Sequence, residues 1–186
     1  MSGIDVTPPG LELALLGFLH EGPLHAYEIH RRLVQAETLG LVWRLKQSHL
    51  YALLGRLEAA GLLVGTTEPQ GVRPPRRVLA LTAAGQEAFT RWVTTPVAHG
   101  RDLRLEFLAK LFFAARDGSP AVSALVEHQR AACADWLADL HAQVDATPTG
   151  QPFATLVLQF RVRQIEGILG WLDLCASTLL AAPREA

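Results

Sequence analysis

The 186-residue sequence lacks the features that mark several common protein classes. Its formal net charge is −1, so the chain as a whole is not basic, and any affinity for nucleic acid has to come from a local patch. The only two cysteines, Cys133 and Cys175, lie in separate apolar patterns, which excludes a disulfide framework and fits a reducing compartment. The N-terminal residues show no secretion signal, and no apolar stretch reaches the roughly 18 to 20 residues that a membrane span needs. We therefore expect a cytoplasmic protein that makes no membrane contact.

Catalytic and metal-binding motifs are missing as well. The histidines show no metal-ligand spacing, and His25 and His30, five residues apart, fall on different faces of a helix. No nucleophile elbow, P-loop, dinucleotide-binding glycine motif or paired-carboxylate site stands out. We therefore expect a protein that is not an enzyme and that holds no cofactor and no metal. Cys133 and Cys175 are either oxidant sensors or buried interface thiols, and the second role is far commoner.

A regular succession of apolar patterns is what the sequence does have. Thr7, followed by two prolines, predicts a helix start before a strongly apolar run. Farther on, Leu50, Leu53, Leu54 and Leu57 recur at helical spacing on one face, and Gly61 then supplies the left-handed conformation that ends a helix. In chain order, we expect helices over 11–19, 25–37 and 47–60, strands over 62–64 and 77–81 around a proline-rich tip over 68–75, and a helix after Thr82.

Three helices, a two-stranded hairpin and a further helix make the layout of a winged helix-turn-helix domain, which we assign to residues 1–95. Beyond residue 95 the patterns are helical only, with helices expected over 103–115, 119–144 and 152–180. We assign residues 96–186 to a helical dimerisation domain. The expected fold class is therefore mainly α: a winged helix-turn-helix N-terminal domain plus a C-terminal helical dimerisation domain.

The dimerisation prediction comes from the last two helices. Their apolar residues form an a/d-like stripe, interrupted once by Gln129, and the last helix is apolar over much of its circumference. Two helices are unable to bury that much surface against each other, so association with a second copy is the simplest solution. Trp136 and Trp171 either line an effector pocket between subunits or pack in the interface, and we favour packing. The expected dimerisation residues are Val122, Leu125, Cys133, Trp136, Leu137, Leu140, Phe160, Ile168, Trp171 and Leu172.

Positive charge is concentrated in one part of the chain. Between Arg44 and Arg77 there are six basic and two acidic residues, although the total charge is −1. The excess lies on the third helix and the hairpin, which are the two elements of a winged helix that face DNA together. Lysine and arginine side chains there would neutralise phosphates and release counterions. The alternative is an ordinary solvated surface, but the coincidence of charge with the DNA-facing elements favours binding.

The third helix is the expected recognition helix, which needs small or polar residues where it enters the major groove. Gly55 is costly inside a helix, and either close approach of another surface or tight packing against the preceding helix explains it. Tyr51 either places its hydroxyl on a phosphate or lies at the rim and packs on the second helix, expected over 25–37. In the hairpin, prolines stiffen a tip that presents arginines to phosphates or the minor groove, although Arg77 has a cross-hairpin pair with Glu68 as an alternative. The expected DNA-binding residues are Lys46, Gln47, Ser48, His49, Tyr51, Ala52, Gly55, Arg56, Arg73, Arg76 and Arg77.

Four segments resemble the PadR family of transcriptional regulators. Residues 24–29, LHAYEI, are similar to the family's hGYEI segment, and the run from Trp43 to Leu62 resembles its W…lYplLkrLe..GLv pattern. Arg76 to Gly85 is similar to the wing-to-helix signature, and residues 101–113 look like a segment of the longer members, which end in helices related to the virulence-activator alpha C-terminal domain. The resemblance covers about residues 11–172 and implies a dimer that binds DNA.

The sequence also departs from the family pattern. Residues 46–49 replace the usual Ser-Pro-Gly entry to the recognition helix, Ala26 replaces a glycine and Leu79 a frequent wing tyrosine, so an operator sequence does not carry over. The leading hypothesis is a homodimeric repressor that binds an inverted repeat in double-stranded DNA and is released by a small-molecule effector. The alternative is a winged-helix module that binds protein and has no DNA function. The sequence separates neither repressor from activator nor one effector from another.

Overall fold

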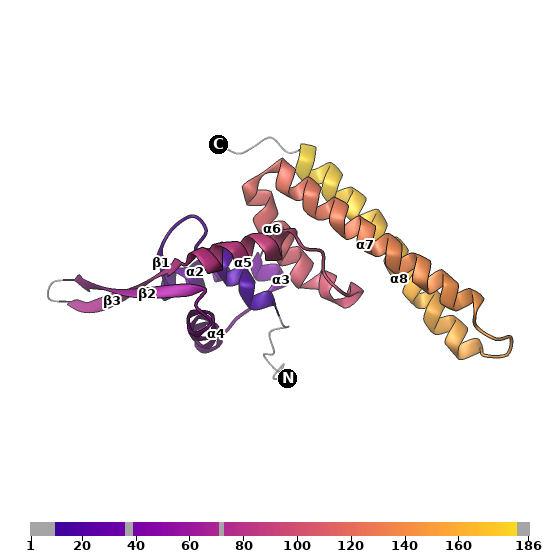
Figure 1. Ribbon diagram of the computed structural model, residues 1–186, viewed down its shortest axis with the longest axis horizontal. Helices are drawn as coiled ribbons and strands as arrows, with labels where there is room; N and C mark the ends of the chain where they lie inside the picture. Colours follow the sequence, from indigo (N-terminus) through magenta and orange to yellow (C-terminus); the bar gives the residue numbers. More distant parts are fainter. Residues whose placement is uncertain (1–9, 36–38, 71–72, 182–186) are drawn as a thin grey trace. The chain divides into compact units, whose positions relative to one another are not determined.

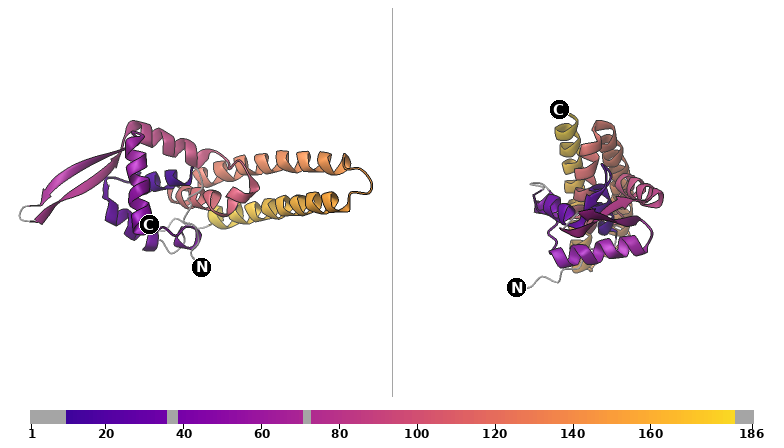
Figure 2. Two further views of the ribbon diagram at one scale, coloured as in Figure 1. Left: turned by 90° about the horizontal axis from the view of Figure 1, so that it is seen from below. Right: turned by 90° about the vertical axis from the view of Figure 1, so that its left-hand side faces the viewer.

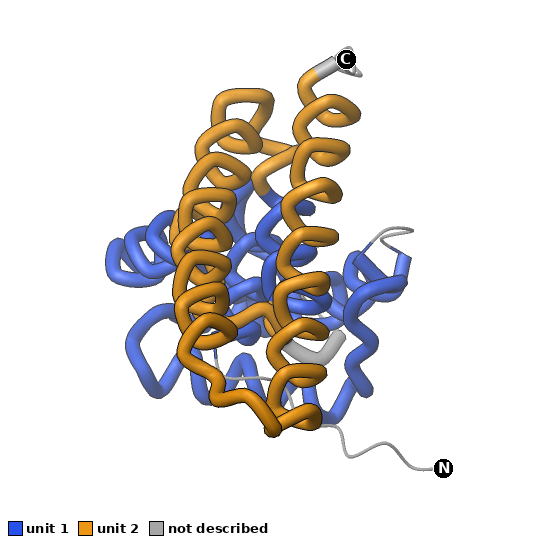
Figure 3. Tube along the Cα trace, turned by 90° about the vertical axis from the view of Figure 1, so that its right-hand side faces the viewer, with its two compact units in different colours: residues 1–93, 103–113 blue, residues 94–102, 114–186 orange. Residues whose placement is uncertain are grey.

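The structure, a computed structural model, describes residues 10–35, 39–70 and 73–181 (Figure 1). The helix start predicted at Thr7 lies outside these residues. The chain divides into two compact units, which Figure 3 colours separately. The assignment of DNA binding to residues 1–95 and of dimerisation to residues 96–186 stays a prediction. The first unit comprises Met1–Val93 and Leu103–Phe113, and the second comprises Thr94–Asp102 and Ala114–Ala186.

The first unit has the winged helix-turn-helix order of elements, so the predicted fold class is confirmed. Helix α4, the predicted recognition helix, precedes the hairpin of β2 and β3, and α5 follows it. The elements in chain order are η1 (Leu11–Leu13), α1 (Ala14–Gly17), β1 (Leu24–His25), α2 (Ala26–Gln35), α3 (Leu39–Val42), α4 (Gln47–Ala59), β2 (Leu63–Gln70), β3 (Arg73–Leu81), α5 (Ala83–Thr94), η2 (Gly100–Arg104) and α6 (Glu106–Asp117), the last two extending into the second unit.

Some element boundaries differ from the prediction. The single helix expected over 11–19 is a 3-10 turn followed by one α-helical turn, because the amide of Leu19 bonds to the carbonyl of Leu16 and so tightens the chain. The stretch between the helices expected over 25–37 and 47–60 contains the short helix α3, which was not predicted. The hairpin strands are longer than expected and continue into the segment predicted as a tip. Pairing is irregular between Glu68 and Gln70, and such a bulge lets a strand accommodate residues that weaken a regular ladder.

The sheet has three antiparallel strands in the order β1-β3-β2. The short strand β1, which the sequence did not predict, places Leu24 opposite Leu79 and His25 opposite Val78. Beyond Val78, therefore, β2 and β3 continue as a two-stranded ribbon, which is visible in Figure 2. We call this ribbon the wing.

Helix α4 ends as the sequence predicts. Gly61 has φ +75°, the amide of Leu62 bonds to the carbonyl of Leu57, and the amide of Gly61 bonds to the carbonyl of Glu58. These two bonds form a Schellman motif, which satisfies carbonyls at a helix C-terminus. Thr82 caps the next helix by accepting a hydrogen bond from the amide of Gly85 at 3.0 Å. The recognition helix and the wing are therefore joined by a tightly specified turn.

The core of the first unit includes aromatic side chains from three helical segments. The ring of Phe113 meets Phe18 and Phe89 edge-on, at centroid distances of 5.4 Å and 5.6 Å. Gly17 packs so closely on Phe113 that a Cβ there would lie 2.5 Å from the ring. Lys110 is buried and pairs with Glu106 at 2.9 Å, which compensates part of the cost of burying its charge.

The second unit contains the two long helices α7 (Ser119–Asp145) and α8 (Pro152–Ala181), close to the predicted ranges. Figures 1 and 2 show them side by side. Pro120 lies in the first turn of α7, where its missing amide hydrogen costs nothing. Within the described residues, neither these nor the other helices are long and apolar enough to cross a membrane.

Candidate nucleic-acid interface

Helix α4 has one buried face and one exposed face. Leu50, Leu53, Leu54 and Leu57 are buried, as their spacing predicted. The predicted DNA-contacting residues lie on the rest of the helix surface, where small and polar side chains leave the backbone accessible. Lys46, Gln47, Ser48, Tyr51, Ala52, Gly55 and Arg56 are exposed, and His49 is half-buried.

Gly55 is the one interior glycine of α4. No heavy atom outside its own helix backbone and its neighbours lies within 4 Å of the position that a Cβ would take. Tight packing against α2, one of the two explanations of this glycine, is therefore wrong. Close approach of an external surface, such as a DNA groove, remains as the explanation that the sequence suggested.

The wing carries the predicted arginines, and they differ in their surroundings. Arg76 is exposed, and within the described part of the chain it makes no ion pair. The side chain of Arg73 lies outside the described residues, although its backbone begins β3. Arg77 pairs with Glu58 of α4, and both carboxylate oxygens lie 2.5 Å from its Nη2. The suggested pair of Arg77 with Glu68 is therefore wrong, because Glu68 lies opposite Arg76 in the register and Arg77 turns toward the helix.

A groove lies between the recognition helix, the wing and the start of α2. Its volume is about 550 Å³, and its floor includes Leu54 and Leu79. Tyr27 and Tyr51 stand on its walls, and their side chains are 61% and 46% exposed. Tyr27 is not among the predicted DNA-binding residues, because tyrosine scores as apolar in a helical pattern. Its exposure adds a second phenolic hydroxyl to the site, beside the one at Tyr51.

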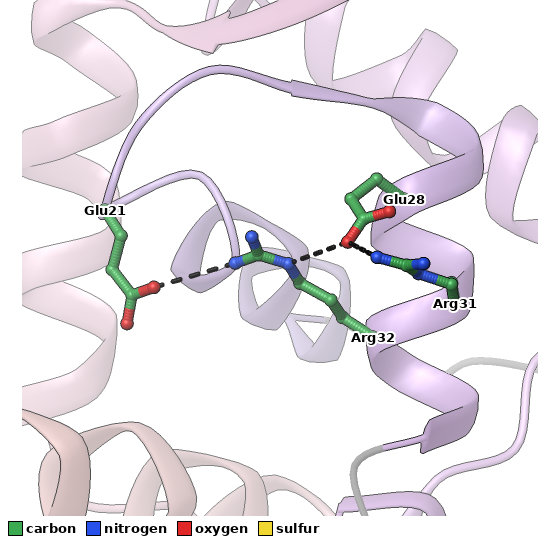
Figure 4. Close-up of polar contacts among 4 residues, drawn as sticks. All are labelled: Glu21, Glu28, Arg31 and Arg32. Atoms are coloured by element: carbon green, nitrogen blue, oxygen red, sulfur yellow. Dashed lines mark hydrogen bonds and ion pairs between the residues drawn. The ribbon is translucent and has the colours of Figure 1, made fainter.

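A chain of ion pairs runs along helix α2 and reaches the turn before β1, as Figure 4 shows. The carboxylate of Glu28 accepts hydrogen bonds from Arg31 at 2.7 Å and from Arg32 at 3.3 Å. Arg32 also lies 3.6 Å from Glu21, in the turn that precedes β1. The hydrogen bond from Arg31 is the largest cause that lowers the pKa of Glu28, so this carboxyl stays ionised in mildly acidic solution. These arginines are therefore engaged within the protein.

The predicted dimerisation residues differ in how much surface they leave for a second chain. A side chain that is buried inside one protomer has no surface left for a partner. Phe160, on α8, is 67% exposed and therefore has such surface. Phe153 and Leu156, which are not in the predicted set, are exposed on the same helix at 79% and 63%. Of the predicted set, Val122, Leu125, Cys133, Leu140 and Leu172 are buried, and Trp136, Leu137, Ile168 and Trp171 are half-buried.

A second cavity lies within the second unit, between residues 98–101 and the two long helices. Its volume is about 430 Å³, and Trp136 and Arg161 are among its lining residues. Trp171 is not part of this lining. The two tryptophans that the sequence linked to an effector pocket therefore do not line this cavity together.

Both cysteines are buried, and burial raises the pKa of each thiol, that of Cys175 to about 11. A thiolate is the form that reacts with oxidants, so these surroundings favour packing over sensing. In the described residues, no three histidine, cysteine, aspartate or glutamate side chains come together as a metal site.

Two family models match the chain. The model of the transcriptional regulator PadR-like family matches residues 15–91. The model named virulence activator alpha C-term matches residues 103–179. Together these matches cover both compact units, in the order that the sequence resemblance predicted.

The chain is also similar to curated relatives and to a solved structure. The negative transcriptional regulator PadR of Bacillus subtilis is 29% identical over 103 residues, which cover 55% of this chain and 56% of that protein, little more than half of its length. The probable transcriptional regulator Rv1176c of Mycobacterium tuberculosis is 26% identical over 184 residues, which cover 89% of this chain and 95% of that protein. A crystal structure of Bacillus subtilis PadR in complex with operator DNA has a TM-score of 0.45 and 24% identity, and the match covers 89% of this chain and 97% of that chain.

Proposed function

We propose that this chain is a homodimeric repressor of the PadR-like family, whose model matches residues 15–91. It binds an inverted repeat in double-stranded DNA and is released by a small-molecule effector. The observation that carries the proposal is the exposed face of α4, with its glycine and polar residues, beside an arginine-bearing wing. In a winged helix these two elements contact one DNA site together. The Bacillus subtilis relative is described as a negative regulator, which supports repression over activation.

DNA binding is tested by genomic footprinting followed by measurements on the operator that it identifies. We expect protected sites to contain inverted repeats, since a two-fold dimer presents two equivalent recognition helices. Arg56→Ala and Gln47→Ala should each lower discrimination between operator and random DNA by about 1 to 3 kcal/mol if the residue makes a bidentate base contact. An absence of protected sites would favour the alternative, a winged-helix module that binds protein.

The exposed apolar side chains of α8 support the homodimer. Phe153, Leu156 and Phe160 leave apolar surface on this helix that one protomer does not cover. Phe160→Glu should shift the protein toward monomer in light scattering at micromolar concentration, because it places a charge in the proposed interface. Ala131→Glu introduces the same charge at an exposed position of α7; it is the control and should remain a dimer. A monomeric wild-type protein would contradict the proposal.

The cavity beside Trp136 supports a small-molecule effector, because an indole ring and an arginine can contact an aromatic ring and its polar substituents together. Thermal shift with a panel of aromatic compounds is the first test, and release of operator DNA by a hit is the second. Trp136→Ala should abolish the shift if this cavity holds the effector. A hit that releases DNA equally well from Trp136→Ala would place the effector elsewhere. We place the protein in the cytoplasm, where its proposed DNA target lies.

A further inference from the structure

We propose that Arg77 is a positioning residue for DNA recognition, which holds the wing against the recognition helix through Glu58. The inference rests on the proposed DNA-binding function, and it assigns to Arg77 a role different from the phosphate contact that its sequence suggests. Its basis is a three-part contact between Glu58 of α4, Gly65 of β2 and Arg77 of β3.

The carboxylate of Glu58 is the centre of this contact. Both of its oxygens accept hydrogen bonds from Nη2 of Arg77, at 2.5 Å each. Oε1 also accepts a hydrogen bond from the backbone amide of Gly65, at 3.1 Å. One side chain of the recognition helix therefore holds both strands of the hairpin, and a charged acceptor makes such hydrogen bonds stronger than neutral ones.

Gly65 provides the space for the guanidinium. A Cβ at this position would lie 2.5 Å from Nε, 2.8 Å from Nη2 and 2.9 Å from Cζ of Arg77. The guanidinium therefore lies directly over the backbone of β2, in the space that the Cβ of any other residue at position 65 would fill. This gives a reason for a glycine inside the strand, where glycine is otherwise unfavourable.

The contact lies where the sheet loses its third strand. Strand β1 pairs with β3 only at Val78 and Leu79, so Arg77 is the first residue of β3 toward the tip without a strand-pairing partner in β1. The ring of His25, at the end of β1, is 3.1 Å from the carbonyl oxygen of Arg77. Two-stranded ribbons twist more strongly than larger sheets, so a side-chain tie at this point limits the angle between wing and helix.

Arg76 provides the contrast within the same strand. It is exposed and makes no ion pair with any described residue, so its charge is available to a phosphate. The charge of Arg77 is already matched by a carboxylate at hydrogen-bond distance. An ion pair that is 60% exposed on the arginine side and 27% on the glutamate side adds little to stability, so the expected effect of breaking it is on DNA discrimination.

Gly65→Ala tests the proposal without changing any charge, because the added methyl group displaces the guanidinium from Glu58. We expect the ratio of operator to random-DNA affinity to fall roughly fivefold, as the wing and the base-reading helix lose their common orientation. Glu58→Gln should lower the same ratio, although it removes a negative charge from a DNA-facing surface. If Arg77 were a phosphate contact, Glu58→Gln would instead strengthen binding to both DNAs, and that result would overturn the proposal.

The salt dependence of binding separates Arg77 from Arg76. Arg76→Ala should flatten the plot of log affinity against log salt by about one unit, through one lost phosphate contact. Arg77→Ala should leave the slope within error of wild type while lowering the operator-to-random ratio. The exchanged pair Glu58→Arg with Arg77→Glu should recover most of the ratio that each single substitution loses. Equal slopes of Arg76→Ala and Arg77→Ala, without recovery in the exchanged pair, would assign Arg77 to phosphate binding.

A measurement without DNA keeps the positioning role distinct from the proposed function. Hydrogen exchange of the β2 and β3 amides near Gly65 should be faster in Gly65→Ala than in wild type, since the tie between ribbon and helix is lost. Gly55→Ala is the control, because its Cβ enters open space, and its wing amides should exchange as in wild type. Unchanged exchange in Gly65→Ala would contradict the tie, whether or not the protein binds DNA.

Discussion

Gln129, in the middle of α7, accepts a hydrogen bond from the backbone amide of Val97 at 2.8 Å, and its side chain is fully buried. Its amide nitrogen also lies 3.8 Å from the sulfur of Cys133. In the sequence Gln129 is only a polar interruption of an apolar stripe. In the structure it holds the segment that follows α5 against the long helix, and the nearby His128 contacts the carbonyl oxygen of Thr94 at 3.2 Å.

The first prediction concerns this buried amide. Gln129→Leu should destabilise the protein by about 1 to 3 kcal/mol, because the amide of Val97 is left buried without an acceptor. The measurement is urea unfolding monitored by circular dichroism. Gln143 is exposed on the same helix, so Gln143→Leu is the control. Equal stability of the Gln129→Leu variant and wild type would show that water or another group replaces the bond.

The second prediction concerns Gly55. Gly55→Ala should stabilise α4 by about 0.5 to 1 kcal/mol, because alanine is the better helix former and its methyl group meets no atom within 4 Å. The same substitution should weaken operator binding if the helix backbone enters the groove at this point. Thermal unfolding and anisotropy titrations on one preparation measure both quantities. A variant that is more stable and binds the operator as tightly as wild type would exclude close approach of DNA to Gly55.

The third prediction concerns the two tyrosines of the groove. Tyr27→Phe and Tyr51→Phe should each weaken binding, and each should weaken it equally for operator and random DNA. The expected loss of binding free energy is about 1.5 to 3 kcal/mol, for one hydrogen bond to a charged phosphate. The affinity for both DNAs is measured at one fixed salt concentration. Unchanged affinity in Tyr51→Phe would leave this residue with the other role considered for it, packing on the rim of α2.

The fourth prediction concerns pH. The folded protein holds the pKa of Glu28 below its ordinary value of 4.5, chiefly through the hydrogen bond from Arg31. Since the unfolded chain binds this proton at higher pH, the stabilisation is present above about pH 4.5 and is lost as the pH falls through the lower folded value. Carbon-detected NMR titration should give the Glu28 carboxyl a pKa below its ordinary value. The Arg31→Ala substitution should raise this pKa. A titration of Glu28 at or above 4.5 in wild type would contradict the ion-pair chain of Figure 4.

The longer helices were predictable from the sequence because their signals are local. Apolar spacing over four leucines predicted α4, and Gly61 predicted where it ends. The two-residue strand β1 carries too little pattern to be seen, and its partner in β3 is more than 50 residues away. The wing strands were predicted too short, because prolines and a glycine signal a turn even where the backbone continues to pair.

The site was predictable in its location and less so in its contacts. Exposure of the recognition helix follows from which face is apolar, whereas the partner of Arg77 depends on how the hairpin folds back on α4. Glu68 is nearer in sequence to Arg77, but Glu58 is nearer in space because the Gly61 turn reverses the chain. Tyr27 is missing from the predicted DNA-binding set, because an amphipathic pattern ranks tyrosine by its ring and not by its hydroxyl.

The central claim is sequence-specific DNA binding by α4 and the wing, and its most direct measurement is fluorescence anisotropy with operator and scrambled duplexes across a salt series. The operator should bind at least about 10³-fold more tightly than the scrambled duplex at physiological salt. Both affinities should fall linearly with salt on logarithmic axes, since phosphate contacts release counterions. Equal affinity for the two duplexes, or an affinity that salt does not change, would contradict the account.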